Sequence, residues 1–568
     1  SPERLANERF RDQLVTVVAP SSGLLVIDEA HCISDWGHDF RPDYRRVARV
    51  LSYMPPGVPV LCTTATANTR VIGDIAEQLG ADLVIARGSL DRESLRLDVI
   101  ELRTQSRRMA WIAQALQVLP GTGIIYTLTI ADAERLAAFL VEVGHDVAAY
   151  SGQTPNDRRK ELEQRLLKGS IKALVATSAL GMGYDKPDLG FVIHFQSPGS
   201  PIAYYQQVGR AGRALPTAYG ILLLGEEDQE IQDFFISTAF PPRETAEAVV
   251  SALDTESVPR GMAWIEARVN VRRSRLETLL KVLEVDGALI KEDSRYLRTA
   301  RPWTYDQDRV DRVTDLRRRE QAVMRHYPQS DCLMAELRRV LDDPHVTPCG
   351  RCSRCVGRPL LSIPPTPPKL TALAERYVRG ESLVIEPRKQ WPTGDDGAMR
   401  AIPKELRVEP GRALARWGSA GWGPAISVGK YRFGSFGADL CQALAELVRR
   451  FPPDHAPTWV TWVPSVAHPT LVSDLARDVA KRLSLPAVEA VRTAGAKHPQ
   501  KTMENSAQQF GNVLHAFEVD AQLVRSGPVL LIDDVVDSRW TMTVVGSRLR
   551  RAGSGPVHPL TLAVAANG

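Results

Sequence analysis

Two adjacent carboxylates follow a short apolar run early in the sequence. The run Leu24-Leu-Val-Ile27 leads directly into Asp28-Glu-Ala-His31. Such a run predicts a buried strand with Asp28 and Glu29 at its C-terminal end, where α/β folds bind ligands. In a nucleotide hydrolase, the first acid would hold Mg²⁺ through water and the second would orient the attacking water. If the tetrapeptide stood alone, surface acids at the end of a strand would be the simpler interpretation.

Four of the seven cysteines lie within 24 residues and could bind a metal ion. Cys332, Cys349, Cys352 and Cys355 have the spacing C-x16-C-x2-C-x2-C. Two residues between thiolates suit the tight turn that lets neighbouring sulfurs share one tetrahedral Zn²⁺ ion. In a long chain whose other cysteines are scattered, this clustering favours metal over disulfides or free thiols. His345 lies inside the loop and could compete as a ligand, although four cysteines already complete the shell.

Short apolar runs alternate with helical patterns through the first 240 residues, which predicts an α/β fold of parallel sheets covered by helices. The runs are Gly23-Leu-Leu-Val-Ile27, Val58-Pro-Val-Leu61, Gly123-Ile-Ile-Tyr126, Ala173-Leu-Val-Ala176 and Phe191-Val-Ile-His194. We expect a polar stretch near residues 90 to 105 to separate two such sheets. A second α/β pattern, from about residue 425 to 568, ends in the apolar strand Val529-Leu-Leu-Ile532.

Size and charge set broad limits on the kind of protein. A length of 568 residues, at about 150 residues per domain, predicts about four domains. The 71 basic and 67 acidic residues leave a net charge of +4, so charge alone does not indicate a nucleic-acid partner. No stretch approaches the roughly 18 apolar residues of a membrane span, and the first residues lack the order of a signal peptide. We expect a cytoplasmic, nucleoid-associated protein with no membrane partner.

The residues after the acidic tetrapeptide resemble a known family. The run Cys32-Ile-Ser-Asp-Trp-Gly-His-Asp-Phe-Arg-Pro-Asp-Tyr44 is similar to the aromatic-rich loop of RecQ DNA helicases. In that family the loop couples single-stranded DNA binding to ATP hydrolysis. Trp36 and Phe40 can stack on bases and Arg41 can pair with phosphate. A core role for these aromatic residues is the alternative.

Further RecQ motifs occur in the family's order. They are Ser1-Pro-Glu-Arg-Leu5, Thr63-Thr-Ala-Thr66, Val175-Ala-Thr-Ser-Ala-Leu-Gly-Met-Gly-Tyr-Asp-Lys-Pro187 and Gln206-Gln-Val-Gly-Arg-Ala-Gly-Arg213. The resemblance implies that Thr64 and Thr66 transmit the nucleotide state towards DNA. It also implies that Thr177 and Gly181 help a second lobe to grip the DNA backbone.

The same resemblance assigns catalytic roles, cofactors and partners. The catalytic residues it implies are Asp28, Glu29, His31, Gln206, Arg210 and Arg213. Arg210 and Arg213 would reach across the cleft between two lobes as arginine fingers, supplying positive charge near the γ-phosphate. The family uses ATP and Mg²⁺, acts on single-stranded and forked or tailed duplex DNA, and moves 3′ to 5′ in DNA repair or recombination.

The glycine-rich phosphate loop of such motors is not found in this sequence. Only 27 residues precede Asp28, and the nearest candidate, Gly423 to Lys430, has five residues between its glycines and is followed by Tyr431 instead of Ser or Thr. We therefore expect an N-terminally truncated helicase, or one whose missing N-terminal segment is supplied separately. This chain alone should hydrolyse ATP poorly or not at all, and DNA-stimulated ATPase from it would refute that expectation.

The cysteine cluster and the segment before it resemble RecQ parts in an altered order. Tyr327-Pro-Gln-Ser-Asp-Cys-Leu-Met-Ala-Glu-Leu337 and Cys349-Gly-Arg-Cys-Ser-Arg-Cys355 look like the RecQ zinc module, whose role is mainly structural. Before it, from about residue 243 to 300, helices followed by a short strand pair resemble a winged helix-turn-helix. A helical spacer whose Arg272, Arg273 and Arg275 form a solvated face is the alternative. In the family the winged helix usually follows the cysteines.

The C-terminal part resembles type I phosphoribosyltransferases. In Val529-Leu-Leu-Ile-Asp-Asp-Val-Val-Asp-Ser-Arg-Trp-Thr541, Asp533 and Asp534 match the acidic pair that holds the ribose hydroxyls. Ser538 and Thr541 suit the turn that wraps a 5′-phosphate at a helix N-terminus. The resemblance therefore implies a possible phosphoribosyl ligand.

Two residues of that turn depart from the family pattern. Asp537 would repel a phosphate, and Arg539 stands where glycine would allow close backbone approach. Fold resemblance is therefore favoured over transferase activity. The alternatives to a helicase are a phosphoribosyltransferase or phosphoribosyl-ligand sensor, and a non-catalytic DNA-binding protein.

The whole arrangement looks like the bacterial RecQ-like helicases of the RqlH type. It predicts a partial first RecA-like lobe (1–98), a second RecA-like lobe (99–240), a winged-helix-like segment (241–304), a tetracysteine zinc-binding module (305–360), a linker and lead-in (361–424) and a phosphoribosyltransferase-like α/β domain (425–568). The run Pro364-Pro-Thr-Pro-Pro368 is expected to form a stiff extended linker.

Overall fold

The computed structural model divides the chain into two compact units. Unit 1 consists of Ser1–Arg243, Lys281–Leu289 and Ala300–Ala374, and unit 2 of Glu244–Leu280, Ile290–Thr299 and Glu375–Gly568. The structure describes residues 10, 13, 17–33, 54–55, 57–66, 68–79, 83–180, 184–379, 382–391, 400–419, 421–465, 467–494 and 506–565.

Unit 1 begins with a small parallel sheet. Strand β1 (Leu25–Asp28) pairs in parallel with β2 (Val60–Thr63), which places Asp28 opposite Thr63. A 3-10 helix, η4 (Ala30–Ile33), and helix α3 (Thr69–Leu79) pack together and supply buried apolar side chains to a small core beside β1. The acidic residues therefore sit at the carboxyl end of a parallel strand, as the apolar run predicts.

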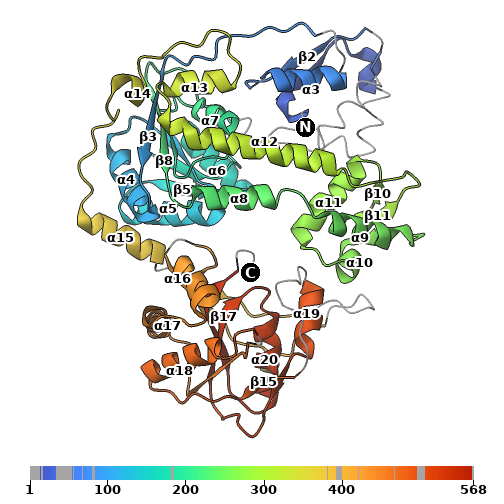
Figure 1. The fold of residues 1–568 in the computed structure, drawn as a ribbon, viewed down its shortest axis with the longest axis vertical. Coiled ribbons are helices and arrows are strands. Elements are labelled where there is room, and N and C mark those ends of the chain that lie inside the picture. The colour runs from blue at the N-terminus through green and yellow to red at the C-terminus, as the bar shows by residue number, and fades with distance from the viewer. Residues whose placement is uncertain are drawn as a thin grey trace. The chain divides into compact units, whose positions relative to one another are not determined.

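A six-stranded parallel sheet, in the order β3-β8-β7-β4-β6-β5, forms the centre of unit 1 (Figure 1). Its strands are β3 (Leu95–Glu101), β4 (Gly123–Tyr126), β5 (Val147–Tyr150), β6 (Ala173–Ala176), β7 (Phe191–His194) and β8 (Ala218–Leu224). The helices between them are α4 (Gln105–Val118), α5 (Ile130–Glu142), α6 (Asn156–Leu167) and α7 (Pro201–Val208), and α8 (Asp228–Ser237) follows β8. Parallel sheets flanked by helices, expected from the sequence, are confirmed here.

The sequence of the central strands explains their burial. Every residue of β4, β6 and β7 is buried, as expected for parallel strands covered on both faces. Gly123 pairs with Phe191, and a Cβ atom at Gly123 would lie only 2.2 Å from the Phe191 ring, so glycine is required there. The loops after the strands end in capped helices: the Thr129 side chain accepts a hydrogen bond from the backbone of Asp132 at the start of α5.

Three further helices complete unit 1. The long helix α12 (Gln307–His326) runs beside α7 and α8 (Figure 1). It is followed by α13 (Leu333–Val340) and α14 (Ser353–Val356). α13 contacts α7 and α14 contacts β3, and residues of this segment belong to the same hydrophobic core as the sheet. The cysteine-bearing segment is thus packed directly on the six-stranded sheet.

The segment expected to resemble a winged helix contains six elements. They are α9 (Arg243–Asp254), β9 (Arg260–Gly261), α10 (Met262–Arg268), α11 (Arg273–Val285), β10 (Leu289–Glu292) and β11 (Arg295–Arg298). The strands form a sheet in the order β10-β11-β9, and β9 is a short strand that the sequence did not indicate. A role in DNA binding for this segment stays a prediction.

Unit 2 also contains a mixed five-stranded sheet in the order β12-β13-β18-β17-β14. Its strands are β12 (Leu383–Ile385), β13 (Gly411–Arg416), β14 (Trp459–Trp462), β17 (Val529–Val536) and β18 (Val557–Val564), and only the β12–β13 pair is antiparallel. Further helices of this unit are α16 (Trp422–Val428), α17 (Ala438–Arg450), α18 (Leu471–Leu483), α19 (Ser506–Leu514) and α20 (Trp540–Arg551), and α15 (Pro368–Arg379) begins in unit 1 and ends in unit 2. A two-stranded antiparallel sheet of β15 (Val491–Thr493) and β16 (Phe517–Val519) accompanies them.

The start and the end of this sheet differ from the sequence-based boundaries. β12 and β13 lie in the stretch 361–424 that was expected to be a linker and lead-in, and β18 follows the strand expected to be last. β13 is short and contains Gly411, Arg412 and Arg416, so its apolar signal is weak in the sequence although Ala413 to Ala415 are buried. In the proline run, Pro368 is the first residue of α15, a position that suits proline because its missing N–H has no partner there.

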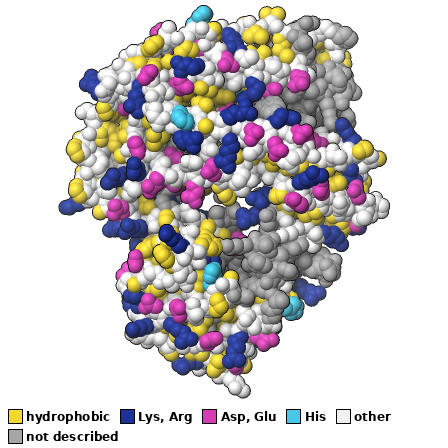
Figure 2. All heavy atoms as spheres, viewed as in Figure 1, with side chains coloured by type: hydrophobic (Ala, Val, Ile, Leu, Met, Phe, Trp, Pro, Cys, Tyr) yellow, Lys and Arg dark blue, Asp and Glu magenta, His cyan; other side chains and the backbone are white. Residues whose placement is uncertain are grey.

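The visible surface shows no large field of one charge. Figure 2 shows basic and acidic side chains interspersed over this face, in keeping with the near balance of charges in the sequence. In the part of the chain that the structure describes, no helix combines the length and apolar character needed to cross a bilayer.

Candidate active site

Asp28 is held in place by two hydrogen bonds at the carboxyl end of β1. Its Oδ1 accepts from the Thr63 hydroxyl at 2.8 Å and from the backbone N–H of Glu29 at 2.9 Å. Thr63 lies directly opposite on β2, so the parallel pairing of the two strands creates this contact. A carboxylate fixed in this way is suited to hold Mg²⁺. Thr63 was not identified as a site residue from the sequence, although the shared edge of two parallel strands could have indicated it.

Glu29 has a strained backbone conformation. Its φ of +52° lies in the left-handed region, which non-glycine residues rarely adopt. Such strain, of the order of 1–3 kcal/mol, is concentrated at functional sites, where the surrounding structure imposes it. The turn directs the Glu29 carboxylate to the ring of His31, with 3.3 Å between Oε2 and Nδ1.

His31 and Gln206 connect segments that are far apart in the sequence. His31 is almost fully buried, and its Nδ1 lies 3.1 Å from the Thr64 hydroxyl. Gln206, on α7, donates from Nε2 to the Thr66 hydroxyl at 3.0 Å and lies 3.4 Å from His31 Nε2. A contiguous polar chain therefore runs from Glu29 through His31 to Gln206 and Thr66. The structure brings together five residues that sequence motifs alone had placed in three separate groups.

A cavity of about 710 Å³ lies where β4, β6 and β7 end. Its lining includes Thr177, Gln206 and Arg210 from the predicted site, so these three residues share one hollow. Thr177, just after β6, is the residue through which the predicted second lobe would contact a DNA backbone. Other residues that line the cavity include Thr127, His194, Gln196, Phe235, Arg317 and Glu320.

The two predicted arginine fingers are bonded within their own part of unit 1. Arg210 donates to the Tyr184 carbonyl at 2.9 Å, and Arg213 donates to Asp185 Oδ1 at 2.8 Å. The Arg213 and Asp185 side chains are 44% and 60% exposed, so their pairing is weak. Contact with a nucleotide phosphate would therefore require these arginines, Arg213 above all, to change partners.

Four predicted site residues lie outside the described residues. These are Trp36, Phe40 and Arg41, expected to bind DNA through the aromatic-rich loop, and Gly181, expected to contact the DNA backbone. Their roles stay predictions from the sequence.

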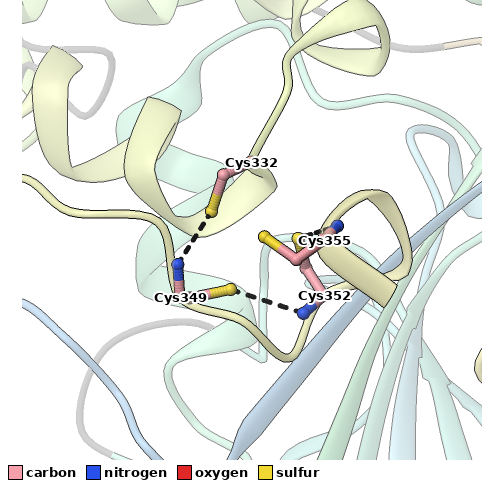
Figure 3. A group of neighbouring side chains, drawn as sticks. All are labelled: Cys332, Cys349, Cys352 and Cys355. Carbon is pink, nitrogen blue, oxygen red and sulfur yellow. Dashed lines mark hydrogen bonds between the residues drawn. The ribbon is translucent and has the colours of Figure 1, made fainter. Parts of the chain in front are cut away.

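The four clustered cysteines converge into a site that could hold zinc. Their sulfur atoms all lie within 4.8 Å of one another (Figure 3). Tetrahedral Zn–S bonds of about 2.3 Å place sulfurs about 3.8 Å apart, so only small shifts separate this arrangement from a complete coordination shell. Backbone N–H groups point at the sulfurs, with Cys349 donating to Cys332 Sγ at 3.2 Å and Cys352 donating to Cys349 Sγ at 3.3 Å. Such donors stabilise the thiolate form that metal binding requires.

The cysteine cluster is joined to the six-stranded sheet by hydrophobic and aromatic contacts. Cys332 and Cys352 belong to the same hydrophobic core as the strands of that sheet. Tyr327, which precedes the cluster, packs edge-on against Tyr204 of α7 with 5.4 Å between ring centroids. A metal ion here would stabilise the packing of α13 and α14 on unit 1.

The C-terminal acidic pair is partly neutralised by a lysine that the sequence analysis treated only as part of a false phosphate loop. Lys430, in the π-helical turn η8 (Gly429–Phe433), forms an ion pair with Asp534 at 2.7 Å, and both side chains are largely buried. Asp533 and Asp534 lie within β17, whereas the resemblance places the acidic pair after a strand.

The turn after β17 is held by arginines. Arg388 donates to the Ser538 carbonyl at 2.8 Å and stacks on the Trp540 ring, with 3.9 Å from Cζ to the ring centroid. Burial, followed by the charge of Arg539, lowers the pKa of Arg388 to about 10. Arg539 has a φ of +67° just before α20, and Thr541 lies in the first turn of that helix. The backbone of this turn is thus already bonded to side chains of its own domain.

Comparison with known proteins adds two family matches. Residues 1–75 match the DEAD/DEAH box helicase family, and residues 108–215 match the helicase conserved C-terminal domain. A domain of the first kind implies ATP and Mg²⁺.

Several curated relatives are RecQ-type helicases. The ATP-dependent DNA helicase RecQ of Bacillus subtilis is 36% identical over 238 residues, covering 42% of this chain and 39% of that protein. The probable ATP-dependent DNA helicase RecS of the same organism is 34% identical over 256 residues, covering 45% and 51%. The RecQ of Synechocystis is 33% identical over 294 residues, covering 48% and 61%. This chain thus spans between 39% and 61% of the length of these relatives.

Solved structures give weaker matches. Dbp5 of S. cerevisiae, bound to RNA and ADP BeF3, aligns at 19% identity over 41% of this chain and 62% of its own, with a TM-score of 0.34. That score is too low to support an inference about this chain.

Proposed function

We propose that this chain, whose two helicase domains and curated relatives support a RecQ-family helicase, acts as an ATP-dependent DNA motor. In this proposal it moves 3′ to 5′ on single-stranded DNA, opens forked or tailed duplexes, and serves DNA repair or recombination in the cytoplasm. The RqlH type describes its arrangement best, because the cysteine cluster and a C-terminal α/β sheet follow the helicase motifs.

The polar chain through Gln206 is the observation that carries the proposal. A motor must make ATP hydrolysis depend on bound DNA, and this requires contacts between the residues that orient water and those of the second RecA-like lobe. Glu29 and His31 supply the first group, and Gln206 joins them to Thr66 and to the cavity that holds Thr177. Rearrangement of one hydrogen-bonded chain can therefore couple the two events.

Replacing Gln206 by alanine tests this coupling. We expect Gln206→Ala to reduce the DNA stimulation of ATP hydrolysis about 5- to 10-fold, in keeping with the loss of one hydrogen bond of roughly 1 kcal/mol between the two groups. Hydrolysis without DNA should change much less, because Glu29 and Asp28 remain in place. The measurement is the rate of phosphate release by the intact protein with and without single-stranded DNA.

Gln164→Ala is the matched control, since Gln164 is an exposed glutamine on α6 of the same unit. It should leave both rates unchanged. Equal losses of the basal and the stimulated rate in Gln206→Ala would contradict a coupling role and indicate a purely structural one.

For the cysteine cluster we propose one structural Zn²⁺ ion. Cys355→Ser is expected to lower the bound zinc from about one ion per chain towards none, and to lower the temperature of unfolding, because three ligands rarely complete a structural site. Metal content after gel filtration and a thermal unfolding curve would measure both effects. Cys62→Ser, at a half-buried cysteine outside the cluster, should keep its zinc. Full zinc content in Cys355→Ser would exclude the four-cysteine site.

For the C-terminal domain we propose a phosphoribosyltransferase-like fold. In it, Lys430 pairs with the Asp534 carboxylate, which would otherwise be available to bind a sugar hydroxyl or a cation. The ion pair with Asp534 and the arginine contacts of the following turn support a structural role for these residues.

A further inference from the structure

Two consecutive phenylalanines on α8 are exposed beside the cavity. Phe234 and Phe235 have 53% and 46% of their surface accessible, and their rings pack edge to face with 6.0 Å between centroids. Phenylalanine is among the more frequently buried residue types. Two of them side by side on one helix form a small apolar patch that no other described residue covers.

Phe235 belongs to the wall of the cavity that holds Thr177 and Arg210. The rest of the wall combines apolar side chains with polar groups, among them Thr127, Gln196 and Arg317. An aromatic ring in a wall of mixed apolar and polar groups suits a flat ligand with polar edges, since the ring contacts one face of the ligand and the polar groups contact its rim.

The charges around the cavity are positive on balance. Two arginines, Arg210 and Arg317, line it together with one acid, Glu320. A ligand that combines flat rings, polar edges and negative charge therefore fits this wall. A nucleotide unit of single-stranded DNA has all three properties.

We propose that Phe235, with Phe234 beside it, stacks on an unpaired base of single-stranded DNA at this cavity, while Arg317 and Thr177 lie along the phosphate backbone. The inference rests on the proposed function, because it assumes that the motor binds single-stranded DNA. It adds a stacking site on α8 that lies outside the helicase motifs of the sequence.

The test is fluorescence anisotropy of the full chain with a fluorescein-labelled single-stranded oligonucleotide of about 16 nucleotides, without ATP. Phe235→Ala is expected to weaken binding about 5- to 150-fold, the range that corresponds to one lost base-stacking contact. Phe235→Trp should retain the affinity, because its ring stacks at least as well. Since Phe235 is about half exposed, the alanine variant should remain folded, which its thermal unfolding curve will show.

Phe433→Ala is the matched control. Phe433 is a phenylalanine of unit 2 that is 68% exposed and does not line the cavity, so its truncation should leave DNA affinity unchanged. An oligonucleotide in which every base is removed should bind the parent protein and Phe235→Ala equally, because no base is left to stack.

The outcomes test the stacking site separately from the proposed DNA-motor function. If the parent protein binds DNA and Phe235→Ala binds as tightly, the stacking site is overturned and the motor is not. If the parent protein does not bind DNA at all, both are overturned. If Phe235→Ala loses affinity for a fluorescent ATP analogue and keeps its DNA affinity, the cavity holds a mononucleotide and the inference is wrong.

Discussion

Replacing Glu29 by glutamine is expected to abolish DNA unwinding by the intact protein while preserving its binding of Mg²⁺ and ATP. In the proposed function the Glu29 carboxylate would orient the attacking water and accept its proton, and a general base of this kind contributes typically about 10²- to 10⁴-fold to a rate. Glutamine has the same size and tolerates the same backbone, so the turn at φ of +52° should persist. The hydrogen bonds that Asp28 accepts from Thr63 and from the backbone of residue 29 do not depend on the Glu29 side chain.

The measurement combines strand separation of a fluorescent tailed duplex with binding of a fluorescent ATP analogue. Glu142→Gln, on the exposed surface of α5, is the control for the loss of one negative charge and should behave as the parent protein does. Unwinding that survives in Glu29→Gln would remove the assignment of the base. Loss of nucleotide binding as well would mean that Glu29 has a structural role through its contact with His31.

The strands of the central sheet could be predicted from the sequence because their signal is local. The apolar runs that begin at Gly123, Ala173 and Phe191 have the same bounds as β4, β6 and β7, since every residue of each run is buried. The strand expected from the run at Val58 starts two residues later. β2 begins at Val60, because Pro59 has no N–H to donate to a neighbouring strand. β13 was missed because two arginines flank its short apolar centre.

Some residues of the candidate site could also be predicted from local sequence patterns, whereas other contacts depend on how the chain folds. Cys349, Cys352 and Cys355 and the acidic pairs follow spacing rules that operate over a few residues, so their positions could be predicted from the sequence. The contact of Gln206 with Thr66 joins residues 140 positions apart, and the pairing of Lys430 with Asp534 depends on how η8 folds over β17. Exposure of Phe235 is likewise a property of the packed helices, because α8 has an ordinary sequence for an amphipathic helix.

Arg213→Ala is expected to reduce DNA-stimulated ATP hydrolysis by the intact protein about 10³- to 10⁵-fold, the contribution of an arginine finger. The structure shows Arg213 bound to Asp185 at 2.8 Å, in a pair whose members are 44% and 60% exposed. Exposed pairs of this kind contribute at most about 1 kcal/mol, so the guanidinium can leave Asp185 for a γ-phosphate with little loss of free energy. ATP binding should change far less than the rate, because the charge acts mainly on the transition state.

The control and a second variant distinguish transfer of the guanidinium from a structural ion pair. Arg165 pairs with Asp146 at 2.8 Å in a comparably exposed setting, so Arg165→Ala should leave the rate unchanged. Asp185→Ala breaks the same pair as Arg213→Ala while keeping the guanidinium. If Arg213 acts on the phosphate, Asp185→Ala should retain or raise the rate, because the arginine no longer has to leave a partner. If the ion pair itself is what matters, Asp185→Ala and Arg213→Ala should lose activity to the same extent, and that result would contradict the role of Arg213 as an arginine finger.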